Sequence, residues 1–442
     1  MMPCKKTKVS IIAAVKMMLS FEKVFQKYPQ GELLAKIFTS TFQAIDPNAI
    51  VKKYLQQYPI NTHKRIFAFG LGKAAIPMAQ SLADEISLTD SLVITKHASE
   101  SKWKFGSIIL GNHPIPGSDS LNAGIQAKRF LSQLTKDDLL ICLISGGGSA
   151  LMTAPVISLE DLQSLTSALL KSGATIHEIN TLRKHLDELK GGGLVQFANG
   201  AQILSLILSD VVGDSLEIIA SGVTVPDSTT IKDASAILEK YNLRGQISDS
   251  VFSSLRETLK PDNYLFENVT NQIVGSNNLA LDFACSQVGQ IWGDKKVKVI
   301  NNNIQGEASK VGIEIAKQFK DALQTMQRPF CLLTGGETTV TIKGNGKGGR
   351  NQQLALSTVE ELADLDNVML ISIATDGEDG PTDAAGAVVT GESYQRSKML
   401  GMDVSSYQLR NDAYHFFESL GDLIKTNPTG TNVNDLVFCF AF

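Results

Sequence analysis

A glycine loop that contains a lysine follows the first buried strand pattern of the chain. The segment FGLGKAA places Gly70, Gly72 and Ala75 between an apolar run and a helical pattern, with Lys73 inside the loop. This GxGxxA spacing is typical of dinucleotide-binding folds, yet Lys96 follows the next strand pattern, where an acidic residue would hold a ribose. A cation in such a loop suits a phosphate group. We therefore predict that Gly72 and Lys73 bind an anion, with a tight turn that binds no ligand as the alternative.

A second glycine loop, in the segment LISGGGSA, ends another buried strand pattern. Three successive glycines let backbone N–H groups curl around an anion, and two hydroxyl groups add further donors. The loop is not the nucleophile elbow of a serine hydrolase, because Leu151 stands where GxSxG requires its second glycine. The residues that we predict to form this anion cradle are Ser145, Gly146, Gly147, Gly148 and Ser149.

Two charged residues complete the candidates in the first half of the chain. Arg183 lies in a charged helical pattern, and its planar guanidinium group can clamp a carboxylate, although the charged face of a helix is more often simply solvated. Asp210 directly follows a buried strand pattern, where a carboxylate can hold a metal or orient a hydroxyl group. Histidines are too sparse along the chain to support a histidine-rich metal site.

Glycines are densest in the second half of the chain, between residues 335 and 386. Gly344, Gly346 and Gly349 form GxGxxG between a strand pattern and a helical pattern, and Arg350 follows directly. Such density is expected where the backbone must approach a ligand closely, with a long glycine hairpin that binds no ligand as the alternative. The residues that we predict to bind substrate or phosphate here are Gly346, Gly348, Gly349 and Asn351.

Carboxylates mark two loops of this second half. Glu337 stands in the segment FCLLTGGETTVTIKG, which we predict to form two short strands joined at Gly335 and Gly336. Asp376 follows a buried strand pattern. Oxygen ligands without cysteine or histidine favour Mg²⁺ over zinc. The candidate metal ligands are therefore Asp210, Glu337 and Asp376.

These candidates together favour phosphoryl transfer, because they combine anion cradles, cations and carboxylates suited to a hard metal. Phosphoryl transfer depends on positioning and charge neutralisation more than on covalent chemistry. The phosphate-binding motif GxxxxGK[ST] is absent, since Phe67 and Thr341 stand where its first glycine would fall. The HRD and DFG segments of protein kinases are also missing. A kinase with this sequence belongs to neither of these common classes.

The loops lie at the ends of strand patterns that alternate with helical patterns. This alternation predicts an α/β fold with a parallel, doubly wound sheet, in which ligands bind where strands end and helices begin. A length of 442 residues suits two or three compact lobes. We predict an N-terminal Rossmann-like domain at 20–268 and a smaller C-terminal α/β domain at 269–442, divided near the polar stretch KPDNYLFEN.

Charge and composition exclude several classes of protein. A formal net charge of −4 argues against the basic face of a nucleic-acid-binding domain and against attraction to anionic lipid. No apolar run reaches the roughly 18 residues that cross a bilayer. The five cysteines are scattered without a CxxC pair, which favours a reducing cytoplasm over a disulfide framework. We therefore expect a cytoplasmic protein without nucleic-acid or membrane partners.

Taken together, several segments resemble the glycerate 2-kinase family, whose C-terminal portion is called the MOFRL domain. They are FGLGKAA, NHPIPGSDS, LISGGGSALM, SGATIHEINTLRKHL, LKGGGL, LSDVVGD, TGGETTVTIKGNGKGGRNQQLAL, ATDGEDGPTDAAGA and PTGTNVNDL. They follow the family's order from about residue 66 to residue 437. The resemblance implies phosphorylation of D-glycerate to 2-phosphoglycerate by ATP and Mg²⁺, in a cleft between two α/β lobes, with the MOFRL region at about 329–438. The oligomeric state is left open, with a homodimer among the options.

The resemblance also implies roles for single residues. In this family the lysine of the GLGKAA loop and the arginine of GGRNQ are held to be critical, so Lys73 and Arg350 would neutralise the transferring γ-phosphoryl group. From their chemistry alone, we predict that Arg183 holds the substrate carboxylate and that the SGGGS loop binds either that carboxylate or a phosphate. The sequence departs from the family pattern, without losing any of these residues, at Asp187, Gly193, Val223 and Asn427.

Two other interpretations remain open. An NAD(P)-dependent hydroxypyruvate reductase would use the GxGxxA loop and would bind a nicotinamide cofactor without ATP. A non-catalytic nucleotide- or metabolite-binding regulator would bind ATP saturably without forming product. The intact set of cations and carboxylates argues against a regulator, because binding alone seldom needs all of them.

Overall fold

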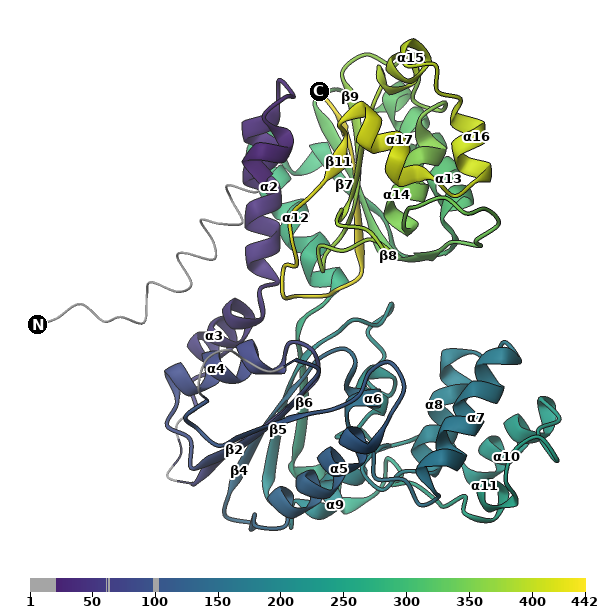
Figure 1. The fold of residues 1–442 in the computed structure, drawn as a ribbon. Helices are drawn as coiled ribbons and strands as arrows, with labels where there is room; N and C mark the ends of the chain where they lie inside the picture. Colours follow the sequence, from purple (N-terminus) through teal and green to yellow (C-terminus); the bar gives the residue numbers. More distant parts are fainter. Residues whose placement is uncertain (1–20, 61, 63, 98–102) are drawn as a thin grey trace, which may run out of the picture. The chain divides into compact units, whose positions relative to one another are not determined.

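The computed structural model describes residues 21–60, 62, 64–97 and 103–442. The chain forms two compact units, which Figure 1 shows with their helices and strands labelled. The first unit runs from Pro47 to Val274, and the second joins Gly275–Phe442 to the segment that ends at Asp46.

A six-stranded sheet organises the first unit. Its strands are β1 (Ile66–Leu71), β2 (Asp90–Thr95), β3 (Ser107–Leu110), β4 (Leu139–Ile144), β5 (Gln202–Leu208) and β6 (Val269–Gly275). Their order is β3-β2-β1-β4-β5-β6, and β1 pairs in parallel with both β2 and β4. Every residue of β1 and β4 is buried, as apolar strands covered on both faces require. The predicted doubly wound sheet is confirmed, with its topological switch point between β1 and β4.

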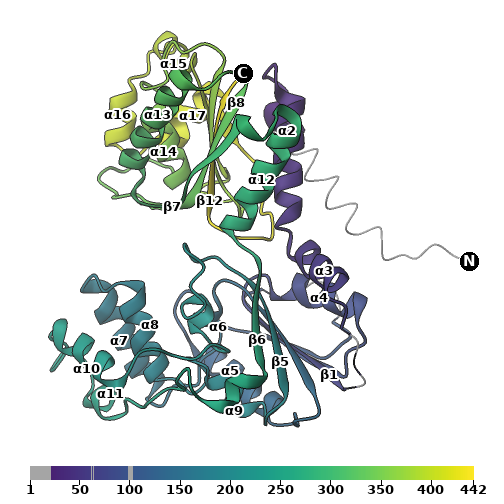
Figure 2. The ribbon, with the colours of Figure 1, turned by 180° about the vertical axis from the view of Figure 1, so that it is seen from behind.

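Helices cover this sheet, and a separate helical group stands at one side of it (Figures 1 and 2). The helices and 3₁₀ turns associated with the sheet are α3 (Pro47–Gln57), α4 (Ala75–Glu85), α5 (Ser118–Leu131), α6 (Gly148–Leu151), α9 (Gly193–Phe197), η1 (Ile219–Ser221) and η2 (Tyr264–Asn268). The helical group consists of α7 (Leu159–Lys171), α8 (Ile176–His185), α10 (Ile231–Lys240) and α11 (Asp249–Ser253). It has its own apolar core, which includes Leu165, Leu182 and Leu238. Because α8 belongs to this group, its position depends on how the group packs.

The second unit contains a mixed six-stranded sheet. Its strands are β7 (Val297–Glu307), β8 (Phe330–Thr339), β9 (Val368–Ala374), β10 (Gly386–Thr390), β11 (Leu423–Ile424) and β12 (Asp435–Ala441). The order is β11-β10-β9-β12-β8-β7; β7 and β8 are parallel, whereas β12 runs antiparallel to both β8 and β9. The helices and the 3₁₀ turn are α12 (Asn277–Trp292), η3 (Asp294–Lys296), α13 (Ala308–Thr325), α14 (Arg350–Thr358), α15 (Ser393–Met399), α16 (Val404–Leu409) and α17 (Ala413–Leu420).

Strand β8 differs from the sequence prediction. The segment predicted to fold into two short strands forms one continuous strand through Gly335 and Gly336. Gly336 has φ +144°, a conformation that glycine adopts at no steric cost. The neighbouring strand β7 shifts register between Asn301 and Ile304. Gly335 and Gly336 therefore let β8 pair with the irregular strand β7, and they do not form a turn.

The segment before Pro47 packs on the second unit, although the sequence analysis assigned residues 20–46 to the first domain. Helix α2 (Gly31–Ala44) places the ring of Phe38 4.5 Å from that of Phe438 on β12. Before it, Lys27 forms an ion pair with the buried carboxylate of Asp422. An amphipathic helix must bury its apolar face, but its sequence does not show which sheet it packs against. The prediction therefore followed the order of the chain.

No helix in the described ranges combines the length and the hydropathy that a membrane crossing needs.

Candidate active site

The loops that follow β1 and β4 are hydrogen-bonded to each other at the switch point of the first sheet. Lys73 N donates to Gly146 O at 2.9 Å. Ala74 N donates to Ser145 Oγ at 3.0 Å. Gly72 has φ +129°, and a side chain there would overlap Ser145, so only glycine fits. The buried hydroxyl group of Ser145 thus holds the two loops together rather than facing solvent.

The side chain of Lys73 is exposed and lies over the SGGGS loop. A methyl group on Gly147 would lie 3.3 Å from Lys73 Cε and 3.3 Å from His113 Nε2. No described carboxylate lies within ion-pair distance of Lys73. The loops after β1, β3 and β4 therefore bring an unpaired ammonium group, an imidazole and a glycine backbone together at the carboxyl edge of the sheet.

The loop after β5 adds a carboxylate to the same place. A side chain on Gly146 would overlap Asp210 Oδ2, so the two residues are in close contact. Burial raises the pKa of Asp210, and the nearby charge of Lys73 offsets part of that rise. The predicted grouping of Lys73, the SGGGS loop and Asp210 is thus present within the first unit.

Ser149 connects the SGGGS loop to helix α8. Ser221 Oγ is hydrogen-bonded to Ser149 Oγ at 2.8 Å and to Asn180 Oδ1 at 2.9 Å. Ser221 has φ +57°, which is uncommon for a residue other than glycine. Strained backbone of this kind is concentrated at functional sites, and here it presents the hydroxyl group that links the two segments.

Arg183 lies one helical turn beyond Asn180, and residues three apart share one face of a helix. Burial lowers the pKa of Arg183, and no carboxylate among the described residues pairs with it. A buried charge is normally paired, so a guanidinium group without a protein partner is suited to an anionic ligand. Its planar donors fit a carboxylate in a bidentate manner.

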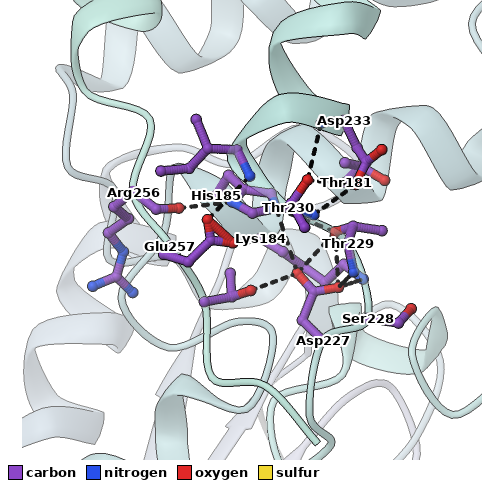
Figure 3. A network of polar contacts seen from close by, with 12 residues as sticks. Thr181, Lys184, His185, Asp227, Ser228, Thr229, Thr230, Asp233, Arg256 and Glu257 are labelled. Carbon is purple, nitrogen blue, oxygen red and sulfur yellow. Dashed lines mark hydrogen bonds and ion pairs between the residues drawn. The ribbon is translucent and has the colours of Figure 1, made fainter.

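The next residues of α8 instead enter a buried polar network, which Figure 3 shows. Lys184 Nζ lies 2.5 Å from Asp227 Oδ1. His185 Nδ1 lies 2.7 Å from Arg256 O, and His185 Nε2 lies 3.2 Å from Thr229 Oγ1. These bonds hold the last turn of α8 through Lys184 and His185, while Asn180, one turn earlier, bonds Ser221.

Asp187, one of the departures from the family pattern, has a structural role. Its buried carboxylate pairs with Lys190 Nζ at 2.9 Å and accepts from Ala154 N at 2.9 Å. Lys190 Nζ also donates to Met152 O at 3.1 Å. The pair therefore supports the backbone that directly follows α6.

The glycine loop of the second unit binds protein. Gly346 N donates to Arg410 O at 2.8 Å, and Lys347 N donates to Asp412 Oδ1 at 3.0 Å. Side chains on Gly344 and Gly346 would overlap residues of that same segment. The glycine density that suggested a phosphate loop thus also serves the close approach of the 410–412 backbone.

Carboxylates surround Arg350, which is the first residue of α14. Its Nε and Nη2 atoms donate to the two oxygens of Asp435 at 2.6 and 3.0 Å, and Nη1 lies 3.1 Å from Glu337 Oε1. Burial opposes the charge of Arg350, but the two carboxylates outweigh it and raise its pKa. Two of its five N–H groups are left after these bonds.

The N-terminus of α14 is already capped by a carboxylate from the β9–β10 loop. Asp379 Oδ1 accepts from Asn351 N at 3.0 Å, and Asp379 Oδ2 accepts from Gln352 N at 2.8 Å. Burial raises the pKa of Asp379 to about 7, although these two bonds oppose the shift. Asn351 is itself buried and accepts from Ser372 Oγ at 2.7 Å. Its observed contacts are therefore with protein, and a phosphate at this helix end would compete with Asp379.

The acidic candidates fall in both units. Asp210 belongs to the first, whereas Glu337 and Asp376 belong to the second. In the described ranges, no three histidine, cysteine or acidic side chains are grouped closely enough to hold a metal ion. Mg²⁺ is commonly held by one or two carboxylates together with substrate phosphates. Glu337 forms an ion pair with Arg350, and the charge of Asp376 contributes to the raised pKa of Asp435.

Sequence reasoning missed several residues of these sites. In the first unit they are His113, Asn180 and Ser221, and in the second it is Asp435. A signal for His113 was present, because its segment NHPIPGSDS follows a strand pattern just as the chosen loops do. Ser221 and Asn180 depend on tertiary contacts between segments that are distant along the chain.

Comparisons with known proteins cover both units. The profile of the MOFRL family matches residues 330–435, and a domain of unknown function, DUF4147, matches residues 33–256. Glycerate 2-kinase of Pyrococcus horikoshii is 40% identical over 84% of this chain and 86% of its own. D-glycerate 2-kinase of Thermotoga maritima is 38% identical over 92% of this chain and 97% of its own.

Solved structures agree with the sequence matches. A crystal structure of a glycerate kinase from Thermotoga maritima superposes with a TM-score of 0.85 at 36% identity, covering 97% of this chain and 100% of its own. A crystal structure of a protein from Pyrococcus horikoshii gives 0.82, also at 36% identity, with 92% and 97% covered. Because relatives that are 38% and 40% identical match most of this chain and most of their own length, the chain belongs to the glycerate 2-kinase family.

Proposed function

We propose that this glycerate kinase transfers the γ-phosphoryl group of ATP to the 2-hydroxyl group of D-glycerate, with Mg²⁺ as the metal. The observation that carries the proposal is a pair of cations, Lys73 beside the SGGGS loop and Arg183 on α8, for which the described residues provide no carboxylate partner. A small hydroxy acid and a phosphoryl donor are both anionic, so binding them together requires spare positive charge. The names of the relatives from Pyrococcus horikoshii and Thermotoga maritima support the same reaction.

Arg183 is the proposed partner of the glycerate carboxylate. Arg183 is half-buried on α8, one helical turn after Asn180, which is linked to Ser149 of the SGGGS loop through Ser221. A charge-assisted, bidentate bond there would both bind the substrate and orient its hydroxyl groups. The buried network of Lys184 holds the last turn of α8.

Lys73 and Arg350 are proposed to act on the same transferring phosphoryl group. The 2-hydroxyl oxygen forms a bond to the γ-phosphorus, the bond from that phosphorus to the bridging oxygen breaks, and ADP leaves. The hydroxyl proton passes to a nearby acceptor, for which Asp210 is the candidate in the first unit because its raised pKa favours proton uptake. Mg²⁺, when bound, would offset charge on the phosphates, with Glu337 and Asp376 as its proposed protein ligands.

Product identification tests this proposal. The protein is incubated with D-glycerate and Mg·ATP, and phosphorus NMR is used to distinguish 2-phosphoglycerate from 3-phosphoglycerate. We expect 2-phosphoglycerate and ADP in equal amounts, and no product when the metal is removed with a chelator. The 3-isomer would contradict the proposed position, and ATP hydrolysis without a phosphorylated acid would contradict the proposed acceptor.

A second candidate function is NAD(P)-dependent reduction of hydroxypyruvate. The observation that favours it is the GxGxxA loop at β1 of a sheet with the strand order of dinucleotide-binding folds. Hydroxypyruvate-dependent oxidation of NADH or NADPH without ATP would support it.

We also propose a cytoplasmic location. Cys142, Cys331 and Cys439 are buried as free thiols, as is usual for proteins of a reducing compartment.

A further inference from the structure

His113 lies at the SGGGS loop without any assigned role. It follows β3, and its imidazole ring is half-buried. A methyl group on Gly147 would lie 3.2 Å from His113 Cδ2 and 3.3 Å from His113 Nε2. The ring thus lies beside the glycine that Lys73 also covers, at the carboxyl edge of the first sheet.

The loop that presents His113 is held by other residues. Asn112 Oδ1 accepts from Asp119 N at 3.0 Å, and Asn112 N donates to Ser120 Oγ at 3.0 Å. Gly111 N donates to Thr95 O at 2.9 Å. No hydrogen bond joins the imidazole of His113 to any described residue. Its ring nitrogens are therefore not needed to build the loop and are available to a ligand.

The protonation state of His113 determines which ligand groups can bond its ring nitrogens. Burial, followed by the charges of Lys73 and Lys96, lowers the pKa of His113 to about 4. The ring is consequently neutral near pH 7, with one N–H donor and one nitrogen that can only accept. A carboxylate has no proton to donate at this pH, and a phosphate group is mostly deprotonated. In glycerate, only the hydroxyl groups can donate to the accepting nitrogen.

We propose that His113 is a substrate-binding residue that accepts a hydrogen bond from a hydroxyl group of the acceptor, beside the phosphoryl group on which Lys73 acts. This inference rests on the proposed function. His113 would then distinguish a hydroxy acid from an acid of the same size without hydroxyl groups, while Arg183 binds the carboxylate of either. A site built to pair a hydroxyl group discriminates strongly against a ligand that lacks it.

Steady-state kinetics of His113→Ala and His113→Gln test the proposal. The alanine variant should reduce kcat/KM for D-glycerate by about 10- to 100-fold, the range for loss of one hydrogen bond in a desolvated site. Its KM for ATP should stay within about twofold of wild type. The glutamine variant retains a neutral donor and acceptor, so it should recover most of the loss. An alanine variant with normal glycerate kinetics, or one impaired only in its KM for ATP, would overturn the proposal, as would a glutamine variant no better than alanine.

A binding measurement separates this inference from the proposed reaction. The chain has six histidines, and the signal of His113 in a proton–carbon NMR spectrum is identified as the one that His113→Gln lacks. Titration of the wild-type protein with D-glycerate should shift this signal, whereas propionate, which has the carboxylate but no hydroxyl group, should shift it much less. Equal shifts with both acids, or none with D-glycerate, would overturn the role of His113. If wild-type protein forms no 2-phosphoglycerate while the D-glycerate shift persists, the proposed reaction fails and the hydroxyl contact stands.

Discussion

The two glycine-rich loops of this protein have similar compositions and different surroundings. In the first unit, Lys73 beside the SGGGS loop and Arg183 on α8 have no carboxylate partner among the residues that the structure describes. In the GNGKGGR loop of the second unit, backbone donors bond the 410–412 segment and Arg350 is paired with two carboxylates. Glycine density alone does not identify a ligand site, whereas donors and charges that the protein leaves unused do.

The same comparison separates two ways in which a cation can serve a reaction. An unpaired cation attracts an anion directly but is costly to bury. An arginine held by two carboxylates is fixed in place, and it has only its remaining N–H groups for a ligand. We therefore expect substitutions in the first unit to affect binding and turnover, and those in the second unit to affect stability as well.

The largest expected effect is on turnover when Lys73 is removed. Lys73→Ala should reduce kcat by about a thousandfold, the range for loss of a cation that stabilises a transferring phosphoryl group. Because Lys73 is exposed and unpaired, the melting temperature should hardly change. Lys136→Ala is the matched control, since Lys136 is an exposed lysine before β4, at the opposite edge of the same sheet. Normal turnover in Lys73→Ala would remove this lysine from the mechanism.

Removal of Arg350 should cost stability as well as activity. Arg350→Met leaves the buried carboxylate of Asp435 without its partner, which is expected to lower the free energy of unfolding by about 3 kcal/mol. Adding Asp435→Asn should recover much of that stability, because the unpaired charge is gone. Chemical denaturation and turnover are measured on both variants. Full activity in the double variant would show that Arg350 serves only to neutralise Asp435.

A matched pair of glycine substitutions should separate the two loops. In Gly146→Ala the added methyl group overlaps the side chain of Asp210, whereas in Gly344→Ala it overlaps the backbone of Arg410. We expect the first variant to lose up to about a hundredfold in kcat, because small displacements at a reacting centre are costly. The second should lose about 1 to 3 kcal/mol of stability. A reversal of these two outcomes would contradict the assignment of the loops.

The smallest expected effect is on the pH dependence of stability. The pKa of Asp379 is about 7 in the folded protein, above its value of roughly 4 in an unfolded chain. Between these two pH values the unfolded chain has lost this proton and the native state still binds it. The free energy of unfolding therefore falls as the pH rises from about 4 to about 7. Melting temperatures of Asp379→Asn should fall less than those of wild type across that range. Parallel curves would show that the pKa of Asp379 is the same in the folded and unfolded states.

Much of the first unit could be predicted from the sequence, because its strands are buried, apolar and followed by glycine loops. The rule that ligands bind at the carboxyl ends of parallel strands selected Lys73, the SGGGS loop and Asp210, and the structure places these close together. The rule could not show that Ser145 faces inward, since either serine of SGGGS can bond a neighbouring loop. That choice depends on the hydrogen bond from Ala74, which is a tertiary contact.

The second unit was harder to predict for a physical reason. Its glycines accommodate close packing of distant segments, as Gly346 does against Arg410, and sequence spacing does not distinguish this from packing against a ligand. The partner of Arg350 is Asp435, which lies 85 residues later in the chain. The segment before Pro47 was misplaced for the same reason, because the aromatic partner of Phe38 is Phe438.

The central claim is that the unpaired arginine of the first unit binds the acceptor and the paired arginine of the second does not. Isothermal titration of D-glycerate, without nucleotide, into wild type, Arg183→Gln and the double variant Arg350→Gln with Asp435→Asn measures this directly. We predict that Arg183→Gln weakens binding by about tenfold or more, as expected for a lost charge-assisted bond, while the double variant binds as wild type does. Unchanged affinity in Arg183→Gln together with lost affinity in the double variant would contradict the account.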